Sequence, residues 1–188
     1  MKAAGVLLAT LTIAACAPGN VRLTHQYVNP MYGAGQFAYA GAGRDLRVDV
    51  AGNPFGGDAQ AFGHAVTDAM QGQHFGPATN FTTSPDQAAR SAYRVVMLFD
   101  PPRSFNPMQL CDGTASALPT QAGQDGVSVF GAFCRGNYSL SSAKGRVAAA
   151  AGPDDPAFRQ LVGRVTHALF PPDRRADPND RCRTLMNC

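Results

Sequence analysis

The cysteines are the residues of this chain with the clearest potential for covalent chemistry. Cys16 lies near the amino terminus, and the others are Cys111, Cys134, Cys182 and Cys188. An even set of four cysteines in an exported chain predicts two disulfides, for which three connectivities are open. We favour Cys111–Cys134 and Cys182–Cys188, because each pair is local in the sequence. A four-cysteine zinc site is the alternative, but no CxxC spacing is present and the compartment of an exported protein is oxidising.

The histidines, serines and carboxylates match no known catalytic or metal-binding spacing. The histidines follow no HExxH or comparable ligand pattern: His25, His64, His74 and His167. Ser128 lacks the second glycine of a GxSxG nucleophile elbow. Asp112 and Asp125 are the candidates for a hydrolase site, although aspartates in loops are commonly turn formers. We therefore expect no catalytic residue, no cofactor and no metal, and keep an envelope hydrolase that uses Asp112 or Asp125 as an alternative.

Residues 100–125 form the segment with the strongest potential for binding. This segment is rich in Pro, Gly and Ser, and a connection of this length in a compact domain is usually functional or disordered. Aromatic side chains and arginine are enriched at protein interfaces. The residues at its start that fit a partner contact are Phe99, Pro101, Pro102, Arg103 and Phe105. The alternative is that Phe99 and Phe105 pack beneath their own loop.

The amino terminus has the layout of an export signal. Met1-Lys2 supplies one positive charge, and an apolar run from Ala3 to Ala15 follows it. A membrane-spanning helix needs about 20 apolar residues, so this run is too short to remain as a conventional transmembrane helix.

The end of the run resembles the lipobox of bacterial lipoproteins. Ile13-Ala14-Ala15-Cys16 has an aliphatic residue, two small residues and then cysteine. The resemblance implies a diacylglycerol on the Cys16 sulfur, cleavage after Ala15 and acylation of the new amino terminus. Each buried methylene contributes about 0.8 kcal/mol, so two or three acyl chains would hold the protein firmly at a membrane. Ala17 in place of Asp implies, by the same resemblance, the outer membrane and a periplasmic location.

Composition is that of a small globular protein. The 188-residue chain is 45% hydrophobic, which suffices for one domain with a core. Its net charge is +3, and its acidic residues are all Asp. This charge is too small and too dispersed for a nucleic-acid-binding protein.

Hydrophobic periodicity predicts a short series of elements. Polar and apolar residues alternate over 45–50 as in a half-buried strand, and an apolar stripe at helical spacing covers 58–71, with Asp58 as cap. The near-continuous apolar run 93–99 predicts a central strand covered on both faces. Strands are also expected over 127–134 and 138–149, joined by a turn at Gly136-Asn137. The last helix is expected to begin at Asp155-Pro156 and to end at Pro171-Pro172.

The resulting prediction is an α+β fold, in which a single sheet of about four strands carries two helices on one face in the order β-α-β-β-β-α. The expected organisation is a signal peptide over 1–15, a lipid-anchored tether over 16–43, a globular domain over 44–172 and a cysteine-containing tail over 173–188.

This layout resembles small envelope lipoproteins of the DUF4136 type and the TolB amino-terminal type. The resemblance is carried by the lipobox at Cys16, the helix at Phe62–Met70, the strand at Tyr93–Phe99 and the closing helix that ends in Leu169-Phe170-Pro171. It implies a role in the cell envelope and no particular reaction. We therefore expect a non-catalytic, lipid-anchored accessory or interaction subunit of an envelope complex. A ligand-binding lipoprotein with a pocket between sheet and helices is a further alternative.

Overall fold

A computed structural model describes residues 20–114 and 126–172 of the chain. The strands are β1 (Arg22–Val28), β2 (Asp45–Ala51), β3 (Asn80–Thr82), β4 (Tyr93–Phe99), β5 (Val127–Arg135) and β6 (Tyr138–Val147). The helices are α1 (Ala34–Gly41), α2 (Ala59–Met70) and α3 (Pro156–Leu169), with a 3-10 turn over Pro107–Gln109.

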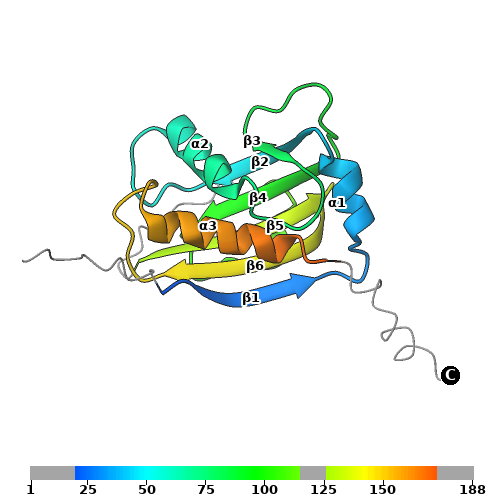
Figure 1. The fold of residues 1–188 in the computed structure, drawn as a ribbon. Coiled ribbons are helices and arrows are strands. Elements are labelled where there is room, and N and C mark those ends of the chain that lie inside the picture. Colours follow the sequence, from blue (N-terminus) through cyan, green and yellow to red (C-terminus); the bar gives the residue numbers. More distant parts are fainter. Residues whose placement is uncertain (1–19, 115–125, 173–188) are drawn as a thin grey trace, which may run out of the picture.

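The fold is α+β, as the sequence predicts, but the described residues form a sheet of six strands and not about four. Its order is β1-β6-β5-β4-β2-β3. β2 runs parallel to β3 and β4, whereas the other neighbouring pairs are antiparallel. α2 and α3 lie over the same face of the sheet (Figure 1), which we call the helix face, and the opposite face is the helix-free face.

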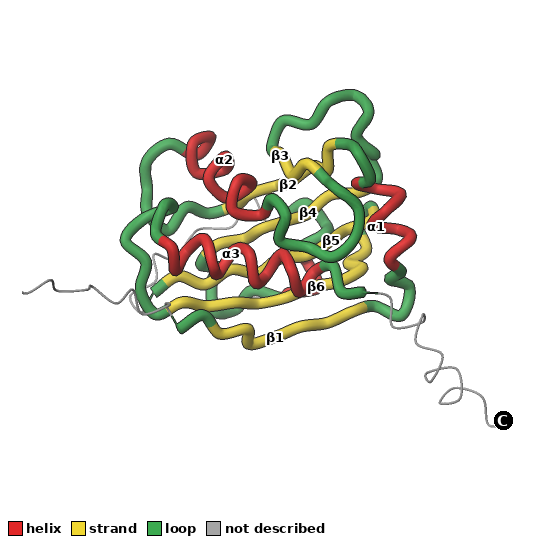
Figure 2. Tube along the Cα trace, in the orientation of Figure 1, coloured by secondary structure: helices red, strands yellow, loops and turns green. Residues whose placement is uncertain are grey.

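The expectation of a tether over 16–43 is wrong for most of its length. β1 pairs with β6 and forms one edge of the sheet, at the side away from β3 (Figure 2). α1 buries Phe37 in the core, and Tyr32, in the loop before it, is buried too. All seven residues of β1 are exposed, so the strand has none of the alternating burial that makes a strand recognisable in a sequence.

β4 is covered on both faces, as its apolar sequence predicts. Tyr93, Val95, Met97 and Phe99 belong to the large core beneath the helices. Val96 and Leu98 belong to a smaller cluster on the helix-free face, together with Ala51, Leu110, Cys111, Phe130, Ala132 and Cys134. β4 is therefore the centre of a three-layered packing.

The predicted helix caps are confirmed. Asp58 accepts a hydrogen bond from the Ala61 backbone N–H at 2.7 Å and begins α2. Asp155 accepts from the Ala157 N–H at 2.8 Å and begins α3, with Pro156 in the first turn. None of the helices in the described part of the chain combines the length and hydropathy needed to cross a bilayer.

Two glycines allow α3 to approach the sheet closely. A Cβ atom on Gly145 of β6 would lie 2.7 Å from Leu161 Cδ1 and 2.8 Å from Val165 Cγ2. A Cβ atom on Gly131 of β5 would lie 2.8 Å from Val165 Cγ1. Since Leu161 and Val165 are fully buried, neither side chain can move aside into solvent.

Substitution of Gly145 by alanine is expected to lower the free energy of unfolding by about 1–3 kcal/mol, because overpacking displaces α3 from the sheet. Chemical denaturation measures the loss. Gly152→Ala is the matched control, since no atom lies within 4 Å of its added Cβ. An equal loss in both variants would contradict this role of Gly145.

Candidate functional site

Residues 100–114, which follow β4 and which we call the covering segment, lie on the helix-free face and are joined to it by a disulfide. Cys111 is bonded to Cys134 of β5, with the Cα atoms 5.7 Å apart, so this predicted pair is confirmed. Leu110 is fully buried in the cluster on this face, and Phe105 packs edge-on against Phe130 with ring centroids 5.7 Å apart. The helices cover one face of the sheet, and this segment, which has almost no regular secondary structure, covers the other. Cys182 and Cys188 lie outside the described residues, as does Cys16.

Arg94, on β4, also holds the covering segment against the sheet. Its side chain projects from β4 onto the helix-free face and is only 16% exposed. Nη2 donates to the Cys111 carbonyl at 2.7 Å, and Nη1 donates to the Gly136 carbonyl at 3.1 Å. Nε lies 3.2 Å from Asp49 Oδ2 on β2. One guanidinium thus links the covering segment, the β5–β6 turn and a neighbouring strand.

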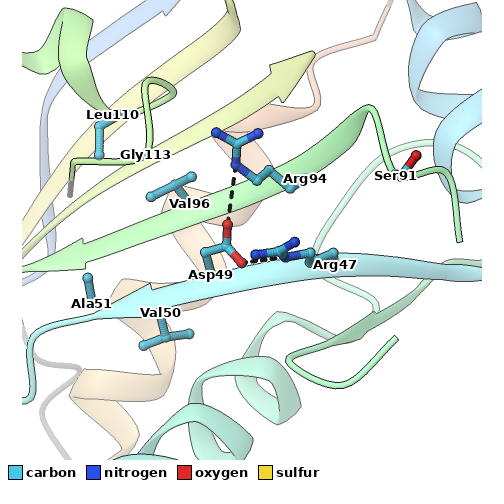
Figure 3. Close-up of a pocket in the computed structure, with 9 residues that line it drawn as sticks. All are labelled: Arg47, Asp49, Val50, Ala51, Ser91, Arg94, Val96, Leu110 and Gly113. Carbon is cyan, nitrogen blue, oxygen red and sulfur yellow. Dashed lines mark hydrogen bonds and ion pairs between the residues drawn. The ribbon is translucent and has the colours of Figure 1, made fainter. Parts of the chain in front are cut away.

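Asp49 lies between two arginines. Its Oδ1 accepts a hydrogen bond from Arg47 Nε at 2.6 Å, while Oδ2 pairs with Arg94 (Figure 3). The Arg47 side chain is 55% exposed, so this pair is open to solvent and to a partner. The parallel register of β2 and β4 brings these residues together across the helix-free face.

A hollow of about 370 Å³ lies beside this group of charges. Its lining residues are Arg47, Asp49, Val50, Ala51, Ser91, Arg94, Val96, Leu110 and Gly113. Apolar residues line part of this hollow, and charged groups line the rest. The lining residues include no histidine or cysteine, and the Asp49 carboxylate is held in ion pairs.

The residues predicted to form a partner contact differ in their exposure to solvent. Phe99 is fully buried beneath the helices, where its ring lies 5.0 Å from that of Phe62 and 5.6 Å from that of Phe158. Its assignment to a contact surface is wrong, because it is the last inward-facing residue of β4. Pro101 and Pro102 are half-buried and Arg103 is exposed. Phe105 is partly buried against the smaller cluster on the helix-free face, as the packing alternative expects.

Of the two hydrolase candidates, only Asp112 lies among the described residues. Asp112 is exposed, and its Oδ1 accepts hydrogen bonds from the Thr114 hydroxyl and the Thr114 N–H. These bonds, led by that of the hydroxyl, lower the pKa of Asp112, which makes it a poor general acid. Asp125 lies outside the described residues.

The histidines are dispersed over the domain. His25 and His64 are exposed, and the ring of His167 lies at a tilt beside that of Phe75, with the ring centroids 4.5 Å apart. His74 lies among Phe37, Phe81 and Phe170, and its Nδ1 is buried without a hydrogen-bond partner. This burial lowers the pKa of His74, against the opposing effect of a backbone hydrogen bond at Phe75. Within residues 20–114 and 126–172, no group of three His, Cys, Asp or Glu side chains could hold a metal ion.

Asp100 is a polar residue that sequence analysis misses. It follows the last residue of β4, is only 4% exposed and has a φ of 41°, in the left-handed region. Oδ1 accepts from the Ser128 N–H at 2.7 Å and from its hydroxyl at 2.9 Å, whereas Oδ2 is buried without a hydrogen-bond partner. Asp100 also lines a second hollow of about 490 Å³, with Phe55 and Asp155 among the other lining residues. The sequence signal was Asp100 before two prolines, since Asp tolerates the left-handed region better than most residues.

Comparison with known proteins identifies no family for this chain. No family model matches it, and comparisons with curated proteins and with solved structures also find no match.

Replacement of Arg94 by glutamine is expected to lower the free energy of unfolding by about 2–3 kcal/mol, because charge-assisted bonds to two backbone carbonyls are lost. Arg47→Gln is the control, since it also removes a partner of Asp49 but from an exposed pair, for which a loss below about 1 kcal/mol is expected. Denaturant unfolding compares the two, and equal losses would mean that Arg94 does not hold the covering segment.

Replacement of Asp100 by alanine is expected to lower stability by about 2–4 kcal/mol, because the bonds from Ser128 are lost and a Cβ-bearing residue without a polar side chain remains at positive φ. Asp100→Asn keeps an acceptor and tolerates the same backbone, so it should stay within about 1 kcal/mol of the parent. Thermal unfolding is the measurement. A loss in the Asn variant as large as in the Ala variant would show that the negative charge itself is required.

Proposed function

We propose that this chain is a lipid-anchored protein of the bacterial cell envelope, without catalytic activity, that binds another envelope protein. The lipid would be attached to Cys16, and the domain would lie at the outer membrane, facing the periplasm. The anchor rests on the export-signal layout and on the resemblance of Ile13-Ala14-Ala15-Cys16 to a lipobox.

One structural observation supports binding most strongly: the segment after β4 is held against the sheet at several points. Its attachments are the disulfide of Cys111, the hydrogen bond from Arg94 and the burial of Leu110. A surface that is rigid before association loses less conformational entropy on binding. Pro101, Pro102 and Arg103, which lie in the same segment, are at least partly accessible.

The hollow beside Arg47 and Asp49 adds a second feature to this surface. Its exposed ion pair and apolar lining residues are the features by which a protein interface combines specificity with buried area. We name the accessible parts of the segment and this hollow, namely Pro101, Pro102, Arg103, Arg47 and Asp49, the cover surface.

A small-ligand-binding role is the second candidate function. It is favoured by the hollow that Asp100 lines, because a buried carboxylate oxygen without a hydrogen-bond partner is costly unless a donor or cation satisfies it.

The proposed function is tested by in-cell photocrosslinking from a single position. A photoreactive amino acid in place of Arg103 is expected to capture one envelope protein, identified by mass spectrometry. The same amino acid in place of Arg159, an exposed residue of α3 on the helix face, should not capture it. The double variant Cys111→Ser/Cys134→Ser should capture less of this envelope protein, because the covering segment loses its covalent attachment to β5.

Metabolic labelling with a palmitate analogue is the control for the anchor, with Cys16→Ser as the unlabelled reference. Identical capture from positions 103 and 159 would argue against the cover surface, and absence of label on the parent protein would argue against the anchor.

A further inference from the structure

Asp100 carries a buried carboxylate oxygen for which the described part of the domain supplies no donor. The residue follows the end of β4 and is only 4% exposed. Its Oδ1 is engaged by Ser128, through the backbone N–H at 2.7 Å and the hydroxyl at 2.9 Å. Its Oδ2 is buried and accepts no hydrogen bond from any described residue. Such an oxygen costs free energy, and a ligand that donates to it or carries a positive charge removes that cost.

Asp100 lines a hollow of about 490 Å³ where β4 ends and α3 begins, which is the end of the sheet away from α1 (Figure 1). Besides Asp100 and Asp155, the described residues that line this hollow are only proline, phenylalanine, glycine, valine and alanine. The described lining therefore includes no basic residue and no side chain that could donate a hydrogen bond. We name this hollow the Asp100 hollow.

Asp155, the second carboxylate of the Asp100 hollow, is the N-cap of α3. Its Oδ1 accepts from the Ala157 N–H at 2.8 Å, and its Oδ2 accepts from the Ala151 N–H at 2.9 Å. These backbone bonds, led by that from Ala151, lower the pKa of Asp155, so its carboxylate stays negative at neutral pH. Part of that charge offsets the positive end of the α3 dipole, which leaves Asp100 as the principal anion of the hollow.

The size and lining of the Asp100 hollow fit a small organic cation better than an anion or a metal ion. Two carboxylates without a basic side chain among the described lining residues would repel an anion. A calcium ion takes about six to eight oxygen ligands, and the described side chains of this hollow offer only two carboxylates. Pockets for small molecules are mostly apolar and measure roughly 300–1,000 Å³. Phe55 and Val127 are among the apolar residues that line this one.

We propose that the Asp100 hollow binds a small organic cation, namely an ammonium group on a short apolar body, with Asp100 as its counter-ion. This inference rests on the second candidate function, small-ligand binding, and names the class of ligand. It is independent of the lipid anchor and of the cover surface. The ammonium group donates a charge-assisted hydrogen bond to Asp100 Oδ2, and the apolar body packs against residues such as Phe55.

An NMR titration of the isotope-labelled full-length protein tests the proposal, because it locates the bound ligand as well as its affinity. Benzylammonium chloride is the probe, benzyl alcohol is its neutral counterpart with the same ring, and calcium chloride represents a metal ion. Benzylammonium is expected to shift the amide signals of Ser128 and Ala151, whose N–H groups bond to the two carboxylates of the hollow. Benzyl alcohol should bind on the order of tenfold more weakly, since it cannot form the charge-assisted bond.

Asp100→Asn is the decisive variant. It keeps an acceptor for Ser128 and tolerates the same backbone, but it loses the charge and places an amide donor where the cation needs an acceptor. Benzylammonium should bind this variant on the order of tenfold or more weakly than the parent. Asp112→Asn is the matched control, because it removes the same charge from an exposed carboxylate that does not line the hollow, and affinity should not change. If Asp100→Asn does not fold, the comparison of benzylammonium with benzyl alcohol in the parent protein decides.

The three probes separate this proposal from the candidate function on which it rests. Equal binding of benzylammonium and benzyl alcohol at the hollow would overturn the class of ligand and leave a small-ligand site in place. Calcium binding that Asp100→Asn abolishes, without binding of benzylammonium, would replace the organic cation by a metal ion. If no probe shifts the signals of Ser128 and Ala151, both the proposal and the small-ligand role are wrong.

Discussion

The burial of β4 on both faces is the constraint on which this structure depends. Apolar side chains alternate along β4 into the large core and into the smaller cluster, so both faces of the sheet need a cover. Helices α2 and α3 supply one cover. The other is a segment with little regular structure, which must obtain its stability from specific attachments. The Cys111–Cys134 disulfide limits the conformations of the unfolded chain, and Arg94 satisfies backbone carbonyls that the cover would otherwise leave without a donor.

The need to cover both faces of the sheet also explains why the candidate binding features lie on the helix-free face. Loops that carry function are usually positioned by a rigid scaffold, and here the scaffold holds the loop by covalent and charged contacts. Asp49 contributes to the attachment of the covering segment, because it orients Arg94 while also pairing with the exposed Arg47. One carboxylate thereby connects the attachment of the cover to the accessible hollow next to it.

The two edges of the sheet are protected in different ways. β3 has only three residues, and such a short edge strand offers little to an added strand. β1 is a longer edge and carries Arg22 and His25, and charged side chains also discourage pairing with other chains.

The sequence by itself determined the features that depend on neighbours along the chain. Periodicity located β2, α2, β4 and α3, their caps were readable from Asp58 and Asp155-Pro156, and proximity of Cys111 to Cys134 favoured the correct pair. Tertiary structure decided what depends on register between distant strands. All residues of β1 are exposed, so its contacts, chiefly its pairing with β6, and not its burial distinguish it from a tether. Asp49 meets Arg94 because β2 and β4 run parallel, and Phe99 is hidden because its face of β4 lies beneath α3. Local periodicity reports burial of one segment, whereas partners across a sheet are set by the packing of the whole chain.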